Sequence, residues 1–206
     1  MKKIIIIACI AIFSISIVSA QPKKQFYSIE YSTGVLLGQS HQFIPNYSWA
    51  GFQISGQFNI LEHLAIGVKF GLNHHYGYKA SETYPLGKGM TIYASTYRYL
   101  RHIPFGVGVF YNILPDKIVK PYIGFHIGGN YETQSIYIQD IQFHDDQYGF
   151  ELSPEIGAFF QFGKAPCGLK LSAIYTWGTN QYVFGGTKFK NYQCFNVNLG
   201  FTYIVN

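Results

Sequence analysis

The feature that most constrains this chain is a repeated alternation of apolar and polar residues, which is the period of a β-strand rather than of a helix. The clearest run covers residues 50–60, where one face consists of Ala50, Phe52, Ile54, Gly56, Phe58 and Ile60. Polar residues and glycine occupy the positions between them. Runs of the same kind cover residues 64–73 and 194–203. Each run predicts a strand with one apolar face and one polar face.

Less regular alternation marks further strands at residues 26–36, 96–111, 121–131, 150–162 and 169–177. The expected connections alternate between short turns at 59–63, 112–120 and 163–168 and long loops at 37–48, 73–95, 133–149 and 178–191. That alternation is typical of outer-membrane barrels, and an even number of strands closes without free edges. The sequence therefore predicts an all-β fold, an eight-stranded antiparallel up-and-down transmembrane β-barrel. Pro104 and Pro154 fall inside expected strands, where they predict a bulge or a strand end.

A soluble β-sandwich shows the same alternation, because its two sheets hide their apolar faces against each other. The composition favours the membrane barrel, since only 12% of the residues are charged and 18% are aromatic, against about 25% charged in average soluble domains. The polar faces are rich in Gly, Ser, Asn and Gln, which suits a narrow lumen. Aromatic residues near strand ends, where rings prefer the lipid headgroup level, are Tyr27, Tyr99, Tyr111, Tyr175, Trp177 and Tyr203.

The amino terminus has the layout of a cleavable secretory signal. Two lysines precede an apolar run at residues 4–18, and Val18-Ser19-Ala20 places small residues before Gln21. The run is shorter than the roughly 20 residues that a spanning helix needs. We therefore expect residues 1–20 to be a signal peptide and residues 21–206 to be a single barrel domain in the bacterial outer membrane.

Three short segments carry a resemblance to a known family. They are Tyr97-Arg98-Tyr99-Leu100 leading to Ile103-Pro104-Phe105, then Lys120-Pro121-Tyr122-Ile123-Gly124, and Ser153-Pro154-Glu155-Ile156-Gly157. With these segments the chain resembles the outer membrane protein beta-barrel domain family of the Bacteroidetes and the small barrels of the OmpA and OmpX type. The resemblance covers essentially all of the mature chain. It implies the fold and the location, and its motifs do not extend to an activity.

Seven charged or titratable side chains are expected to face the lumen. They are Glu30, Lys69, Arg98, His126, Glu151, Glu155 and Lys170. Eight strands leave an interior just wide enough for side chains, and an unpaired buried charge is costly. We therefore expect a structural ion-pair network rather than a wide pore. The alternative is a polar path or a catalytic cluster, because charges at membrane depth are often functional.

The long loops carry aromatic residues that are expected to form an extracellular surface. They are Phe43, Tyr47, Tyr76, Tyr78, Tyr84, Tyr137, Tyr182 and Phe184. Loops on a rigid scaffold carry most recognition, so this surface predicts a structural or adhesive role through glycan contact or lipopolysaccharide packing. The alternative is that these rings only cover the barrel mouth.

The competing functional class is an outer-membrane hydrolase that modifies lipid A, such as the PagL-type deacylases, whose motif is His-x-Ser-Asn. The nearest segment is residues 126–130, where Gly128 stands in the place of the nucleophile and has no hydroxyl to activate. Ser153 lies on one face with Glu151 and Glu155 but has no positioned histidine. The sequence therefore predicts no catalytic residue and a non-enzymatic protein.

No cofactor or metal ligand is predicted, although His41, His74-His75 and His144-Asp145-Asp146 fall in outer loops where imidazole and carboxylate groups could meet. The net charge of +5 includes two lysines of the signal, and the chain has no basic run, so nucleic acid is excluded as a partner. The expected partners are outer-membrane lipid and lipopolysaccharide, the barrel assembly machinery and an extracellular ligand that the sequence does not identify. Cys167 and Cys194 fall near opposite barrel ends, beyond the roughly 7 Å that a disulfide allows, so free thiols are expected.

Overall fold

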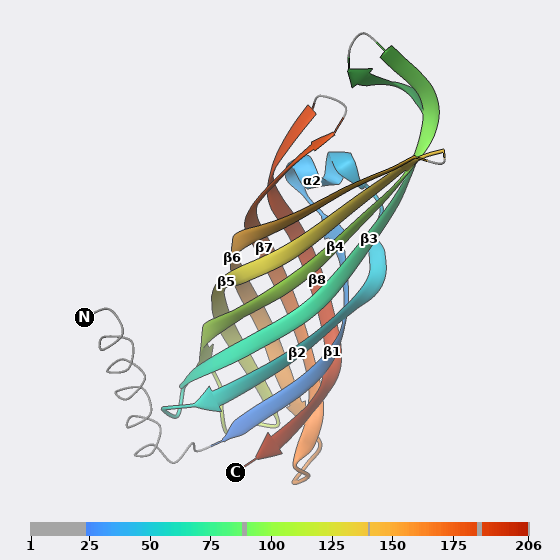
Figure 1. Cartoon of the computed structure of the whole chain (residues 1–206). Helices are drawn as coiled ribbons and strands as arrows, with labels where there is room; N and C mark the ends of the chain where they lie inside the picture. The colour runs from blue at the N-terminus through green and yellow to red at the C-terminus, as the bar shows by residue number, and fades with distance from the viewer. Residues whose placement is uncertain (1–23, 88–89, 140, 185–186, 206) are drawn as a thin grey trace, which may run out of the picture.

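The computed structural model describes residues 24–87, 90–139, 141–184 and 187–205, so the predicted signal at 1–20 lies outside the described residues. Its strands form a closed antiparallel ring in chain order, in which the last strand pairs with the first (Figure 1). Closure gives each strand a hydrogen-bonding neighbour on both sides, as a lipid environment requires. The predicted up-and-down barrel is confirmed.

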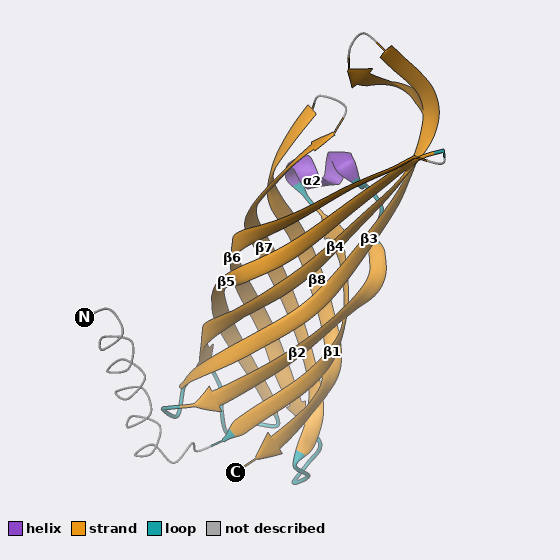
Figure 2. Ribbon diagram, viewed as in Figure 1, coloured by secondary structure: helices purple, strands orange, loops and turns teal. Residues whose placement is uncertain are grey.

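In the described part of the chain, the ring consists of eight strands, and one short helix follows the first strand (Figure 2). The elements are β1 (Gln25–Leu36), α2 (Gly38–Phe43), β2 (Ser48–Asn59), β3 (Leu64–Gly87), β4 (Met90–Asn112), β5 (Val119–Ile138), β6 (Ile141–Gln161), β7 (Cys167–Phe184) and β8 (Thr187–Val205). Within the described residues, no helix is both long enough and apolar enough to cross a membrane.

Three of the four expected long loops are wrong as loops, because the strands continue through them. Residues 73–95, 133–149 and 178–191 belong to hairpins that extend β3–β4, β5–β6 and β7–β8. The alternation of inward and outward positions persists there, but the apolar residues no longer mark the outward face. Residues 37–48 do connect two strands irregularly, and they contain α2.

Neither Pro104 nor Pro154 produces the expected bulge or strand end. The β4–β5 register passes Pro104 opposite Asn130 without a shift, and the β5–β6 register passes Pro154 opposite Phe125. On the other side of each proline the pairing is interrupted and then resumes in the same register. The missing N–H donor therefore interrupts one ladder locally without displacing the strand.

The outward face of the barrel is apolar, which is the reverse of a soluble protein. Along β4, Val107 and Val109 expose 57% and 53% of their surface. Corresponding residues on the neighbouring strands include Val68, Phe70, Ile123, Phe125 and Ile127. A sandwich would bury these side chains between sheets, so the exposed apolar belt excludes the soluble alternative.

The interior is arranged in three layers. A mostly aromatic cluster of Phe26, Ala65, Phe110, Tyr122, Phe159 and Ile204 fills the end at which β1 begins and β8 ends. Polar and charged side chains fill the middle. At the opposite end, α2 is inserted into the mouth, where the apolar cluster is Leu36, Phe43, Ile44, Ala94, Leu100, Ile136, Ile138, Tyr192 and Cys194.

Above the barrel, four strands continue as an open sheet that we call the projecting sheet, residues 75–87, 90–101, 132–138 and 141–150. Pairing between β2 and β3 ends at Ala50 and His74, and pairing between β6 and β7 ends at Glu151 and Gly178. The β3–β4 hairpin reaches beyond the rest of the molecule (Figure 1). The projecting sheet therefore has two free edges, on β3 and on β6.

Candidate functional site

All seven sequence-predicted lumen residues point inward and are buried, none exposing more than 5% of its surface. They come from seven positions on β1, β3, β4, β5, β6 and β7, because alternate residues of each strand face the lumen. Six of the seven lie in two charged layers in the middle of the barrel. The seventh, Arg98, lies higher, beside α2.

The lower charged layer is centred on Lys170. Its ammonium nitrogen lies 3.0 Å from Glu30 Oε1 and 3.3 Å from Glu155 Oε1. Glu155 also contacts His126 Nε2 at 2.7 Å and accepts a hydrogen bond of 2.5 Å from the Tyr122 hydroxyl. A lysine shared by two carboxylates, each with further donors, satisfies the charges that burial would otherwise make costly.

The upper charged layer joins Lys69 to Glu151 at 2.9 Å, and Lys69 also donates to the Ser153 hydroxyl at 2.8 Å. His102 lies between Glu151 at 3.2 Å and Glu132 at 3.4 Å. His102 and Glu132 were not among the lumen residues predicted from the sequence. His102 shares the inward parity of Arg98, which was a usable signal, whereas Glu132 lies just past the expected end of its strand.

Arg98 and Phe43 fasten α2 into the barrel mouth. The Arg98 guanidinium donates to the Phe43 carbonyl oxygen at 3.0 Å and lies 5.2 Å from the centre of the Phe43 ring. Phe43 exposes only 1% of its surface, so its predicted place on the extracellular aromatic surface is wrong. It is instead part of the apolar cluster that closes the mouth.

The hydrolase candidates considered from the sequence are enclosed in this interior. Ser153, Glu151, Glu155 and His126 each expose 2% or less of their surface. Ser153 is hydrogen-bonded to Lys69, Glu151 and Thr176. Apolar clusters lie at both ends of the lumen, so among the described residues these groups are shielded from a substrate outside the barrel.

The extracellular aromatic residues lie mainly on strands. Tyr76 and Tyr78 on β3 and Tyr137 on β5 face outward on the projecting sheet. Tyr47 is exposed beside Trp49 and shares a hydrogen bond of 2.7 Å with Thr33. The side chains of Tyr84, Tyr182 and Phe184 lie outside the part of the chain whose side chains are described.

Two tyrosines of β4 join those of β3 and β5 to form a continuous surface. Ring centres are 5.2 Å apart for Tyr78 and Tyr97, 5.1 Å for Tyr76 and Tyr99, and 5.7 Å for Tyr99 and Tyr137. We call these five residues the tyrosine face. The face stands above the apolar belt, on the outward side of the projecting sheet.

The histidines considered as metal ligands are separated by the strand period. His74 faces outward and His75 faces the lumen, while His41 lies in α2 and contacts the Leu36 carbonyl oxygen at 3.1 Å. His144 lies on the outward side of β6 beside Asp146. Among the residues that the structure describes, no group of three His, Cys, Asp or Glu side chains has an arrangement that would hold a metal. Cys167 and Cys194 are free thiols at opposite ends of the barrel.

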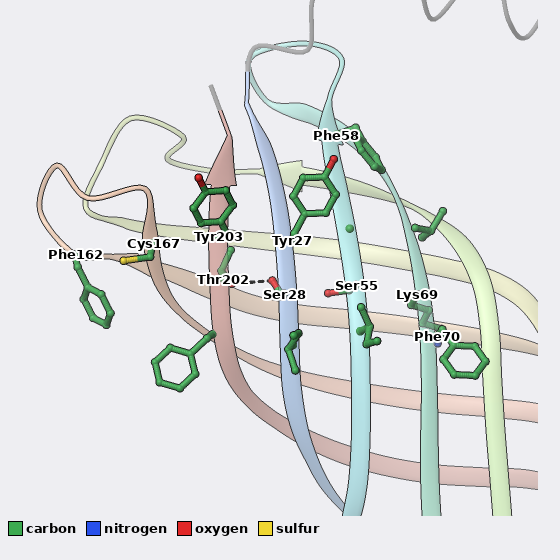
Figure 3. Close-up of a pocket in the computed structure, with 15 residues that line it drawn as sticks. Tyr27, Ser28, Ser55, Phe58, Lys69, Phe70, Phe162, Cys167, Thr202 and Tyr203 are labelled. Atoms are coloured by element: carbon green, nitrogen blue, oxygen red, sulfur yellow. Dashed lines mark hydrogen bonds between the residues drawn. The ribbon is translucent and has the colours of Figure 1, made fainter.

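A groove marks the outward face near the start of β1 and the end of β8 (Figure 3). Tyr27, Phe58, Phe70, Phe162 and Tyr203 surround it, and Gly56 leaves a gap in the row of larger apolar side chains. Polar residues of the same segment, such as Ser28 and Thr202, are buried and hydrogen-bond each other at 2.7 Å on the lumen side. The groove is an apolar recess in the belt, suited to a lipid acyl chain.

The closed ring, the exposed apolar belt and the filled polar interior define a small transmembrane β-barrel, and this class of fold belongs to the bacterial outer membrane. No protein-family model and no curated protein matches the chain in sequence. Its similarity to known proteins is therefore one of structure.

The chain is similar in structure to Ail, the attachment invasion locus protein of Yersinia pestis, with a TM-score of 0.53 and 10% identity over 88% of this chain and 98% of that chain. Ail is also known in complex with the heparin analogue sucrose octasulfate. OprG from Pseudomonas aeruginosa has a TM-score of 0.50 and 9% identity, covering 89% of this chain and 96% of that chain. A major outer membrane protein of Thermus thermophilus has a TM-score of 0.50 and 13% identity, covering 88% of this chain and 99% of that chain. Identities this low establish the fold alone, and the fold together with the belt assigns the chain to the outer membrane.

Proposed function

We propose that this outer-membrane barrel is a surface-interaction protein that binds through its projecting sheet and does not act as a wide pore. The observation that carries the proposal is the tyrosine face, five neighbouring rings held by three adjacent strands above the belt. Exposed aromatic groups of this size on a soluble surface mark interaction sites. A strand scaffold holds them rigidly, so little side-chain entropy is lost on binding.

The chemistry of the tyrosine face favours a carbohydrate partner. Aromatic rings stack against the C–H faces of sugars, while each tyrosine hydroxyl can hydrogen-bond a sugar hydroxyl. Tyr78 and Tyr97 expose 50% and 44% of their surface, so their rings are accessible. The structural neighbour Ail, an attachment protein that has been crystallised with a heparin analogue, supports an adhesive role for a barrel of this architecture.

The filled lumen supports the proposal that the barrel does not act as a wide pore. Ion pairs span the middle of the barrel, and apolar clusters lie at both ends. The proposal also includes outer-membrane lipid and lipopolysaccharide around the belt, the barrel assembly machinery as the folding partner, and membership of the Bacteroidetes-type family indicated by the sequence motifs.

The test is binding of the refolded full-length mature chain to an array of neutral and sulfated oligosaccharides. We expect Tyr97→Ala and Tyr99→Ala together to lower binding by tenfold or more, while Tyr111→Ala has no effect. Tyr111 is a matched control because it is an exposed, outward tyrosine of the same strand at the opposite end of the belt. Binding that is absent in the wild type, or that falls equally in the control, contradicts the recognition role. A large steady conductance in planar bilayers contradicts the closed lumen.

A further inference from the structure

Three side chains on the outward face of β5 and β6 form a hydrogen-bonded chain. The Ser135 hydroxyl oxygen lies 3.1 Å from His144 Nδ1, and His144 Nε2 lies 3.2 Å from Asp146 Oδ2. Ser135 and His144 are directly opposite each other in the β5–β6 register. Asp146 follows His144 by two positions and therefore shares its face. Hydroxyl, imidazole and carboxylate stand in the order that activates a serine nucleophile.

We propose that Ser135, His144 and Asp146 form a hydrolytic site for the acyl esters of membrane lipids, with Ser135 as nucleophile, His144 as general base and Asp146 as the group that orients the imidazole. This activity goes beyond the surface-interaction role proposed above. It rests on different residues, so each proposal can fail without the other.

The height of the three residues on the barrel identifies the class of substrate. The next cross-strand pair towards the membrane with the same outward parity is Thr133 and Asp146, followed by Tyr131 and Tyr148. Below these pairs the outward positions belong to the apolar belt, with Phe150 and Ile127 exposed by 44% and 45%. The site thus lies above the belt, two outward pairs beyond Tyr131 and Tyr148, on the side of the polar part of a lipid, to which its ester bonds belong.

An exposed cation on the same face suits an anionic headgroup. Arg101 lies opposite Thr133 in the β4–β5 register and opposite His74 in the β3–β4 register. Among the described residues, Arg101 forms no ion pair with a carboxylate. Guanidinium groups bind phosphate with paired hydrogen bonds, so Arg101 would bind a lipid phosphate beside the ester to be cleaved.

The proton and bond changes balance with water as the only co-reactant. Asp146 accepts a hydrogen bond from His144 Nε2–H, which leaves Nδ1 free to take the Ser135 proton. The serine oxygen then bonds to the ester carbonyl carbon, the ester C–O bond breaks, and the leaving alcohol receives the proton from His144. Water, deprotonated by the same imidazole, releases the fatty acid and restores the serine.

The surroundings of Asp146 support its role as a carboxylate. Hydrogen bonding from Thr133, with smaller contributions from Tyr131 and His144, lowers the pKa of the Asp146 side chain below its ordinary value. The group is therefore ionised at neutral pH and able to orient the imidazole.

The first experiment is labelling of the refolded full-length mature chain with a fluorophosphonate probe, followed by peptide mass spectrometry. We expect the label on Ser135, a loss of labelling in Ser135→Ala, and a reduction of about 10²–10⁴-fold in His144→Ala. Ser95→Ala is the matched control, because Ser95 is a partly exposed serine of β4 in the same sheet that, among the described residues, has no hydrogen bond to histidine. Circular dichroism and heat-modified gel migration establish that each variant is folded.

The second experiment incubates the folded chain with vesicles of phospholipid alone or of phospholipid with lipopolysaccharide, and measures released fatty acid by mass spectrometry. Release from the phospholipid vesicles assigns phospholipid as the substrate, and release only from the mixed vesicles assigns lipopolysaccharide. We expect Arg101→Ala to slow release from the lipid more than hydrolysis of the neutral ester p-nitrophenyl butyrate. A wild-type chain that is folded yet neither labelled at Ser135 nor active on any of these esters overturns the proposal.

Discussion

The lower and upper halves of the same four strands carry opposite patterns. Within the barrel, β4 turns Val107 and Val109 outward to lipid, while His102 faces the charged interior. In the projecting sheet, the same strand turns Tyr97 outward and buries Leu100 against α2 and its neighbours. The alternation of positions continues, but the large aliphatic residues, which face outward in the barrel, face inward in the projecting sheet.

The reversal shows that the type of residue on each face depends on whether lipid or water surrounds it, and not on the strand that carries it. Lipid surrounds the barrel, so its polar groups collect inside and must pair with one another. Water surrounds the projecting sheet, so its apolar groups collect inside and its polar and aromatic groups face out. The change occurs within two residues on β4, between Ile103 and Arg101, where the apolar belt ends.

The largest expected effect comes from breaking the lumen network. Lys170→Met removes the cation shared by Glu30 and Glu155, leaving buried carboxylates without their main partner. We expect a loss of about 3–5 kcal/mol in the free energy of unfolding, measured by urea titration in lipid vesicles. A loss below about 1 kcal/mol would mean that water reaches this layer freely.

A charge placed on the outward face tests the two surroundings directly. Val107→Arg lies in the belt and should cost about 2–4 kcal/mol. Tyr97→Arg, on the same face of the same strand above the belt, should change stability by about 0.5 kcal/mol or less. Folding yields in vesicles and urea midpoints measure both, and equal costs would contradict the boundary between these positions.

Replacing a glycine by alanine should distinguish the barrel from the projecting sheet by a smaller difference in stability. A Cβ atom on Gly128 would overlap the Phe105 carbonyl oxygen and approach Gly106 Cα at 2.6 Å, so the backbone would have to move. A Cβ atom on Gly77 would lie 3.1 Å from Ile44 Cγ2, and that side chain can shift. We expect Gly128→Ala to cost about 1–3 kcal/mol and Gly77→Ala less, by the same titration. A larger cost for Gly77→Ala than for Gly128→Ala would show that α2 is held more tightly than the barrel wall.

The smallest effect is expected for an ion pair in water. Lys79 and Glu82 lie 2.7 Å apart on the projecting sheet with side chains 43% and 50% exposed. Lys79→Met should cost about 0–1 kcal/mol, and any cost should vanish at high salt because solvent ions screen the pair. A cost that persists in 1 M salt would place this pair in drier surroundings than its exposure indicates.

Strand parity within the membrane was predictable because lipid demands an unbroken apolar face. Glu30 and Lys170 could be assigned to the lumen in this way, and the structure places both there. Their partners could not all be named, because contacts across the lumen depend on barrel diameter and strand stagger. The upper strands were mistaken for loops because the reversed pattern removes the apolar outward face.

The outward serine site was missed for a related reason. His144 and Asp146 have the spacing of neighbours on one strand face, but residues 133–149 were interpreted as a loop. Their contact with Ser135 also requires that Ile138 pair with Ile141, and Gln139, which follows Ile138, has a φ of 52°. A shift of one residue in that pairing would place Ser135 on the opposite face from His144.

The seam of the ring has a consequence for how the chain is made. β1 pairs with β8 continuously from Gln25 and Val205 to Leu36 and Cys194. β1 is synthesised first and its partner β8 last, so the ring cannot close before the chain is complete. A chain that lacks β8 retains two edge strands, β1 and β7, whose amide groups have no partner. Contacts so distant in sequence form slowly. We therefore expect closure to be all-or-none, and loss of β8 alone, residues 187–205, should leave no partially closed product that can reside in lipid.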